Sequence, residues 1–305
     1  MSMPVGVPAF LYRETRLLNR TESLSVMQEK LLLIGIAALG AVVLVGIIGA
    51  VRVRLRRRML MRRLHAAVAQ RRQQILTPQP LTALPPPVQR YLDRAVRDAP
   101  QAEWIELWEE GQFRSFAYPR WGKLKARGVY TGTVPGMIWN ARVRHSLFRW
   151  YTIELLYASG VGRGSLKLWG AFTLFDPDGP EANEALLVRV LMETVWFPTS
   201  LVPGGLLRWE SLGRDDVARA VLSDSGITIR ADFYFTTDGD VERIVTLDKY
   251  RDADTGYERE QCTMYCSDWQ QCGPVRIPME VRLEWNLERE NFEYMRRRVV
   301  EVRYR

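Results

Sequence analysis

Hydrophobic residues follow three different patterns along this chain of 305 residues. Residues 31–51 are apolar without interruption, with no charge, amide or hydroxyl among 21 positions. Residues 87–99 and 180–198 show helical periodicity, and from about residue 103 apolar and polar positions alternate in short runs. The patterns predict an N-terminal apolar helix followed by a domain built mainly of β-strands.

The apolar run is long enough to cross a membrane. At about 1.5 Å per helical residue it spans a hydrocarbon core of roughly 30 Å. We therefore predict a transmembrane helix over residues 31–51, preceded by a flexible segment over residues 1–30. Gly46 and Ala50 are four residues apart, a spacing that could let two such helices pack as a homodimer. Glycines tolerated in a lone membrane span explain this spacing equally well.

The distribution of positive charge predicts which side of the membrane each end of the chain occupies. Four Lys or Arg residues precede the apolar run, whereas nine arginines and no acid follow it within residues 52–75. The side richer in Lys and Arg stays in the cytoplasm. We therefore expect a single-pass protein of the cell membrane whose C-terminal domain is cytoplasmic.

The formal net charge of +8 comes from this local cluster. Subtracting its nine charges leaves about −1 for the rest of the chain, so we expect no nucleic-acid partner, because phosphate contacts need a basic surface on the folded domain. Residues 52–76 predict a basic helix that lies on an anionic leaflet. An alternative is that its arginines act only as a topology signal. The residues expected at the membrane surface are Arg52, Arg54, Arg56, Arg57, Arg58, Arg62 and Arg63.

A proline-rich linker over residues 77–87 separates this basic helix from the domain, which we expect to span residues 88–305. Its first element is predicted to be a short amphipathic helix that begins near proline. The apolar stripe of this helix consists of Val88, Tyr91, Leu92, Ala95 and Val96.

Residues 103–175 and 205–304 contain many aromatic and β-branched residues, separated by turn sequences such as Asp-Ser-Gly and Thr-Asp-Gly-Asp. Closely spaced strands with tight turns favour antiparallel pairing. Gly160, Gly162 and Gly164 resemble a nucleotide-binding loop, but no helix follows them, so we interpret them as part of a hairpin. In the second half we predict strands at 205–212, 217–224, 227–236, 241–250, 257–266, 275–287 and 292–304.

One long helical pattern, residues 180–198, interrupts the strands. It is apolar nearly all round, which is typical of a buried helix. The predicted fold is therefore mainly β with few helices: one strongly curved antiparallel sheet, a half-barrel, around this buried helix, plus the transmembrane helix. Arg189 and Glu193 are the exceptions on the apolar helix and lie one turn apart on one face.

Three stretches resemble a bacterial family of domains of unknown function: LPPPVQRYL at 84–92, VPGMIWNARV at 134–143 and RVLMETVWFPTSLVP at 189–203. The resemblance covers residues 84–305 and brings no activity with it. The strand-rich pattern with one buried helix is also similar in architecture to the half-barrels of bacterial lipoprotein carriers. Fold alone does not determine function.

The residues expected to line the concave face of the sheet are Trp139, Arg142, Trp169, Trp196, Phe197 and Trp209, with core packing as the alternative for each aromatic residue. The residues proposed to bind a ligand are Trp139, Arg142, Arg189, Glu193, Trp196 and Phe197. For Arg189 and Glu193 the favoured alternative is a buried structural ion pair. Glu106, Glu109 and Glu110 are expected on a solvated face. The sequence shows no nucleophile with a matching base, so no catalytic residue is assigned.

We expect no metal site and no cofactor. The three cysteines, Cys262, Cys266 and Cys272, have no fourth ligand nearby, and free thiols in a reducing compartment explain them best. The sequence therefore favours a membrane-anchored, non-enzymatic domain that binds an apolar ligand, such as a lipid or acyl chain, near the bilayer. The alternatives are a protein-interaction or dimerisation module at the membrane, and an enzyme that uses Glu193 on a membrane-associated substrate.

Overall fold

The computed structural model describes residues 83–96, 99–253 and 256–305 of the chain, together with separate positions before them. These positions are 30, 32–37, 40, 44, 51, 55, 58, 59, 61, 62, 64–66, 68 and 69. The chain divides into two units, residues 1–57 and residues 58–305, which are described separately below.

In the first unit, the described positions between residues 30 and 55 are helical and their side chains are exposed. Most of the predicted transmembrane helix, and the predicted segment 1–29, lie outside the described residues. None of the helices that can be described has both the length and the apolar character needed to cross a membrane.

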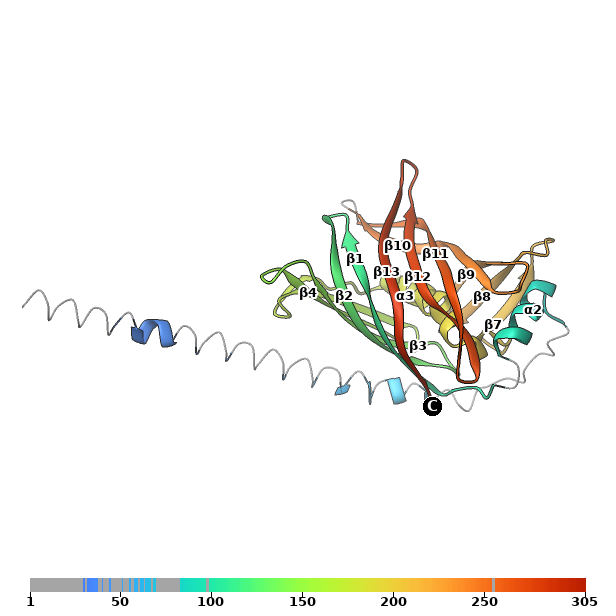
Figure 1. Cartoon of the computed structure of the whole chain (residues 1–305), viewed down its shortest axis with the longest axis horizontal. Coiled ribbons are helices and arrows are strands. Elements are labelled where there is room, and N and C mark those ends of the chain that lie inside the picture. The colour runs from blue at the N-terminus through green and yellow to red at the C-terminus, as the bar shows by residue number, and fades with distance from the viewer. Residues whose placement is uncertain are drawn as a thin grey trace, which may run out of the picture. The chain divides into compact units, whose positions relative to one another are not determined.

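The second unit contains one antiparallel sheet of 13 strands (Figure 1). Two successive meanders, β1 to β6 and β7 to β13, are joined where β1 pairs with β13, and β6 and β7 form the two open edges. The prediction of a mainly β domain with one large antiparallel sheet is confirmed. The first meander consists of β1 (Trp104–Ser115), β2 (Tyr118–Thr131), β3 (Gly136–Arg144), β4 (Trp150–Ala158), β5 (Val161–Leu168) and β6 (Phe172–Phe175). The second consists of β7 (Leu207–Ser211), β8 (Val217–Asp224), β9 (Ile227–Phe235), β10 (Val241–Ala253), β11 (Gly256–Cys272), β12 (Val275–Asn286) and β13 (Asn291–Tyr304).

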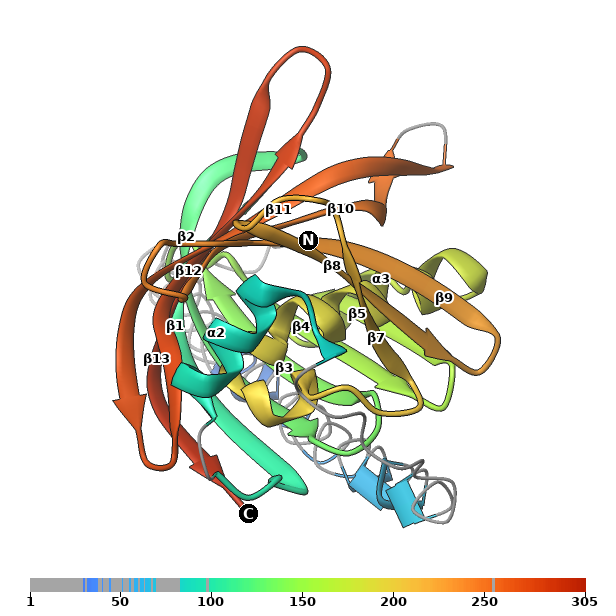
Figure 2. The same ribbon diagram turned by 90° about the vertical axis from the view of Figure 1, so that its right-hand side faces the viewer.

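Helix α3 (Pro180–Glu193) connects the two edges of the sheet and lies inside its curve (Figure 2). It contacts β4 and β5 of the first meander and β9 and β10 of the second. Pro180 begins the helix, and the uninterrupted buried run Leu186–Glu193 explains why it needs cover on all sides.

The α-helix ends earlier than the predicted residue 198. After Glu193 the chain continues as two 3₁₀ turns, η3 (Thr194–Trp196) and η4 (Pro198–Leu201). Phe197 between them is not helical, because the ring of a following proline disfavours the α conformation.

Helix α2 (Pro86–Ala95) packs against η4, β8 and β12, and its predicted apolar stripe is buried. Leu84, Pro85 and Pro87 are also buried, so the packed domain begins slightly before the expected residue 88. The remainder of the predicted linker, residues 77–82, lies outside the described residues.

The three closely spaced glycines belong to a hairpin, as predicted. Gly160 and Ser159 form the β4–β5 turn with positive φ values of 79° and 51°. A side chain on Gly162 would meet the backbone of Ala182 at 2.5 Å, so this glycine permits close approach of α3 to β5.

Part of the basic segment packs on the domain. Leu64 and Val68 are buried, and Leu64 clusters with Ile138 of β3 and Leu156 of β4. His65 stacks on Trp104 with ring centroids 4.3 Å apart. These apolar positions of the expected membrane-surface helix therefore contact protein.

Candidate functional site

The concave side of the sheet contains two adjoining features: a cluster of buried charged residues and a cavity. The charge cluster consists of Glu109 on β1, Arg189 and Glu193 on α3, and Arg297 on β13, all of them buried. Tyr130 and Trp139 supply its neutral hydrogen-bond donors.

Glu193 is the centre of this cluster. Its Oε1 atom lies 3.0 Å from Arg189 Nε and 2.6 Å from Arg297 Nη2. The Tyr130 hydroxyl donates a hydrogen bond to Oε2 over 2.7 Å. Both carboxylate oxygens are thus engaged, which favours the structural explanation of the Arg189–Glu193 pair.

Glu109 extends the cluster towards β1. Arg297 Nη1 lies 3.2 Å from Glu109 Oε1, and Trp139 Nε1 donates a hydrogen bond to Oε2 over 2.8 Å. The two guanidinium groups also lie over aromatic rings, Arg189 over Trp139 at 4.1 Å and Arg297 over Trp196 at 4.7 Å. The cluster therefore pairs two positive and two negative charges inside an aromatic enclosure.

The two carboxyl groups have pKa values shifted in opposite directions. Burial alone would raise the pKa of Glu193, but Arg189 and Arg297 outweigh burial and hold it below the ordinary range. Burial raises the pKa of Glu109, and the nearby Glu193 adds to this rise although Arg297 opposes it. Glu193 is accordingly the more firmly ionised of the two.

Four of the six predicted ligand-binding residues, Trp139, Arg189, Glu193 and Trp196, meet in this cluster. The prediction for Arg142 is corrected, because this side chain is exposed on the convex face of β3 and lies over Trp150. The expectation that Trp169 lines the concave face is also corrected, because this residue is exposed in the turn between β5 and β6. Its neighbours Ala141 and Val143 are the residues that point inward, as alternation along a strand requires.

Sequence reasoning missed Glu109, Arg297 and Tyr130, and the expectation that Glu109 is solvated was wrong. The signal that could have found two of them is alternation. Glu109 follows the inward positions Ile105 and Leu107 of β1, and Arg297 lies between the inward positions Met295 and Val299 of β13. Because both residues are charged, they would ordinarily be expected on the solvated, outward face of the sheet.

The cavity lies where α2, α3 and η4 meet the loop between β2 and β3, and it has a volume of about 800 Å³. None of its described lining residues is charged. Its apolar walls come chiefly from Val190 and Leu191 of α3, Phe197, and Leu206, Leu207 and Leu222.

Hydroxyl groups of the cavity wall are mostly turned to the backbone. Ser200 Oγ donates to Gly132 O over 2.7 Å, and Thr194 Oγ1 donates to Leu191 O over 2.6 Å. The buried Thr133 Oγ1 makes no hydrogen bond to any described residue. The cavity can therefore take an apolar group, and the Thr133 hydroxyl is available for a polar contact.

Phe197, the fifth predicted residue, connects the two features. It lines the cavity, and its ring centroid lies 5.2 Å from that of Tyr130, whose hydroxyl binds Glu193. Glu193 itself does not line the cavity.

Cys262 and Cys266 are buried on β11, Cys272 is half-buried, and all three are free thiols. Across the described part of the chain, no three His, Cys, Asp or Glu side chains are grouped so that they could hold a metal ion.

Comparison with known proteins gives a family and distant structural similarities. Residues 74–297 match a family of unknown function, DUF6544. No curated protein matches the chain.

Two solved structures are similar to this chain at low identity. One is a LolA superfamily protein from Nitrosomonas europaea, with 11% identity and a TM-score of 0.41, covering 72% of this chain and 92% of that one. The other is a DUF1329 family protein from Desulfovibrio piger, with 8% identity and a TM-score of 0.38, covering 67% and 86%.

The resemblance to a family of unknown function, expected from three sequence stretches, is confirmed by a match that spans most of the chain. The protein belongs to the family of unknown function DUF6544.

Proposed function

We propose that this protein binds an apolar ligand, a lipid or an acyl chain, in the cavity beside α3, and that it does so at the cell membrane. The single observation that supports ligand binding is the cavity of about 800 Å³, whose described lining residues are all uncharged. Binding cavities for small molecules commonly have volumes of roughly 300–1,000 Å³ and mainly apolar walls.

The composition of the cavity wall also indicates which part of a ligand would enter it. A phosphate or carboxylate would find no basic side chain among the described lining residues and would lose its hydration without compensation from them. An acyl chain has no polar group to desolvate, so its transfer from water to these apolar walls is favourable. Any polar head group is expected to remain near the rim.

The membrane part of the proposal rests on the sequence. The apolar residues 31–51 supply the anchor, and the arginines that follow favour a cytoplasmic C-terminal domain.

Native mass spectrometry of the full chain, purified in detergent, tests ligand binding. We expect a co-purified lipid or fatty acid that is released on denaturation. Val202→Trp should reduce it, because Val202 is a half-buried residue of the cavity wall and the larger ring would occupy the space.

The matched control is Val300→Trp, the same substitution at an exposed position of β13. It should leave the ligand content unchanged. A folded wild-type protein without any bound apolar molecule, or equal ligand content in both variants, would contradict the proposal.

A further inference from the structure

The two most exposed large apolar side chains of the described residues are neighbours at a hairpin tip. Leu147 and Phe148 lie in the β3–β4 turn with 77% and 81% of their surface exposed. Solvent-exposed apolar residues are ordinary when scattered, but a contiguous group indicates an interaction surface.

A second hairpin tip continues the group. Trp169 lies in the β5–β6 turn, and its indole Nε1 donates a hydrogen bond to Phe148 O over 2.8 Å. Phe172 and Leu174 of the edge strand β6 are also exposed, and Trp169 and Phe172 rings lie 5.9 Å apart. We call these five residues, Leu147, Phe148, Trp169, Phe172 and Leu174, the hairpin patch.

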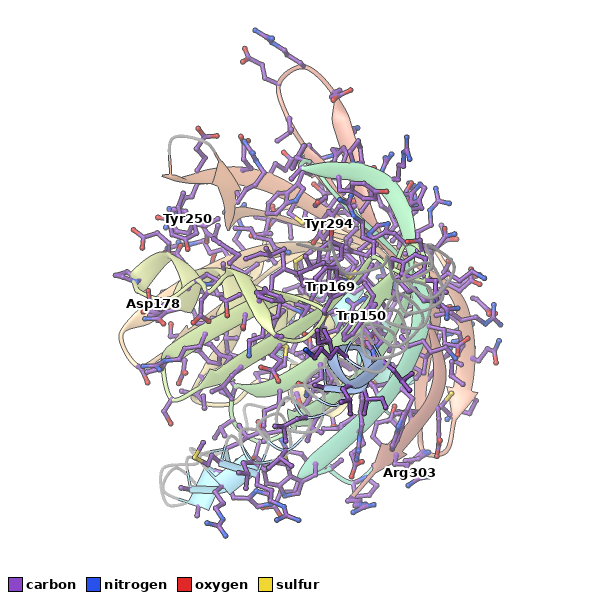
Figure 3. All side chains as sticks on the ribbon, turned by 90° about the vertical axis from the view of Figure 1, so that its left-hand side faces the viewer. Trp150, Trp169, Asp178, Tyr250, Tyr294 and Arg303 are labelled. Atoms are coloured by element: carbon purple, nitrogen blue, oxygen red, sulfur yellow. The ribbon has the colours of Figure 1, made fainter. Side chains whose placement is uncertain are left out.

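The backbone holds Trp169 outward at a conformational cost. Its φ is 55°, a region that bulky side chains rarely adopt and that turns usually give to Gly or Asn. Trp169 lies beside Trp150 of β4 at this end of the sheet (Figure 3), and its backbone nitrogen donates to Trp150 O over 3.1 Å. The two tips therefore form one connected surface.

Exposed basic residues lie at the β3–β4 hairpin tip, and two exposed acids, Asp176 and Asp178, follow the end of β6. The stretch from the start of β3 to the end of β6 contains one acid, Glu154, which is buried and lies 3.9 Å from Lys167. Arg144 and Arg149 flank the β3–β4 tip and are exposed, and Lys123 of β2 lies directly opposite Arg144 in the sheet. The other Lys and Arg residues of the stretch are Arg142, Arg163 and Lys167.

We infer that the hairpin patch is a docking surface for an anionic lipid bilayer. Its aromatic and aliphatic side chains enter the interfacial layer, and the surrounding arginines and lysine contact lipid phosphates. Apolar insertion combined with basic residues is the combination by which soluble surfaces bind anionic leaflets.

This surface is separate from the cavity. The cavity lies at the β2–β3 loop, whereas the patch lies at the opposite end of β3, a strand of 9 residues and thus about 30 Å long. Loss of docking and loss of ligand binding can therefore be observed independently.

Site-directed fluorescence on the full chain in lipid vesicles tests the inference. An environment-sensitive dye is placed by Phe148→Cys, or by Val300→Cys as the exposed control on β13. Both carry Cys272→Ser, so that the introduced thiol is the accessible one beside the buried Cys262 and Cys266. The vesicles contain phosphatidylglycerol and phosphatidylcholine, with or without a nitroxide-bearing lipid.

In these anionic vesicles the dye at residue 148 should shift its emission to the blue and be quenched by the nitroxide lipid, whereas the dye at residue 300 should do neither. In phosphatidylcholine alone, or after Arg144→Glu with Arg149→Glu, the quenching at residue 148 should be lost. The inference would be overturned if the two dyes showed the same emission shift and quenching. It would also be overturned if the quenching at residue 148 were unchanged both in phosphatidylcholine alone and after the arginine substitutions. A blue shift that rises with protein concentration in detergent, without lipid quenching, would overturn it in favour of a second copy of the chain.

Discussion

Replacing Glu193 with glutamine removes the central negative charge of the buried cluster while keeping the size of the side chain. Arg297 would then keep one carboxylate partner, Glu109, and Arg189 would lose its ion pair. Loss of one partner from a buried ion pair typically costs about 3–5 kcal/mol, because the other charge stays buried without compensation. We expect a destabilisation of this size.

Thermal unfolding of the full chain in detergent, followed by circular dichroism, measures the effect. For a domain of this size each kcal/mol corresponds to about 2–4 °C in midpoint, so Glu193→Gln should lower the midpoint by roughly 6–20 °C. The matched control is Glu301→Gln, which removes an exposed partner of Arg303 and should cost at most about 1 kcal/mol.

A second substitution strengthens the test. Arg189→Met added to Glu193→Gln removes the positive charge that is left without a carboxylate partner, so it should recover part of the lost stability. A wild-type midpoint for Glu193→Gln would refute the structural role of the cluster. If such a folded variant also lost its bound lipid, Glu193 would have to act on the ligand.

Four further outcomes are expected. The pKa of Glu193 is lower in the folded than in the unfolded state, so its ionised carboxylate stabilises the fold at pH values above the unfolded pKa near 4.5. This stabilisation is lost as the pH falls through the folded pKa. The difference in unfolding midpoint between wild type and Glu193→Gln should therefore narrow in acid. Gly160→Ala should cost about 1–2 kcal/mol because φ is 79°, and Gly204→Ala, which adds a methyl group in open space, should not. In the native protein a thiol reagent should modify Cys272 slowly and spare the other two cysteines, whose burial raises their pKa, whereas all three should react after denaturation. Arg142→Ala should change neither the unfolding midpoint nor the lipid content, because this side chain is exposed on the convex face.

The sequence by itself determined the elements of the domain. Alternation and turn residues located the strands of the second meander within about three residues, except that β11 continues to Cys272, six residues past its predicted end. Pro180 with an apolar surface all round located α3 and its burial. These features are decided by neighbouring residues, because side-chain period and turn chemistry are local properties.

Only the tertiary structure decided what those elements enclose. The β1–β13 pairing joins residues as distant as Ile105 and Tyr304, and it brings Glu109 and Arg297 together beside α3. Alternation placed both on the inward face, but a buried charge is tolerated only when its partners are present, and those partners come from segments far apart in the chain. The cavity likewise exists only where α2, α3, η4 and the β2–β3 loop meet, so no local pattern could have revealed it.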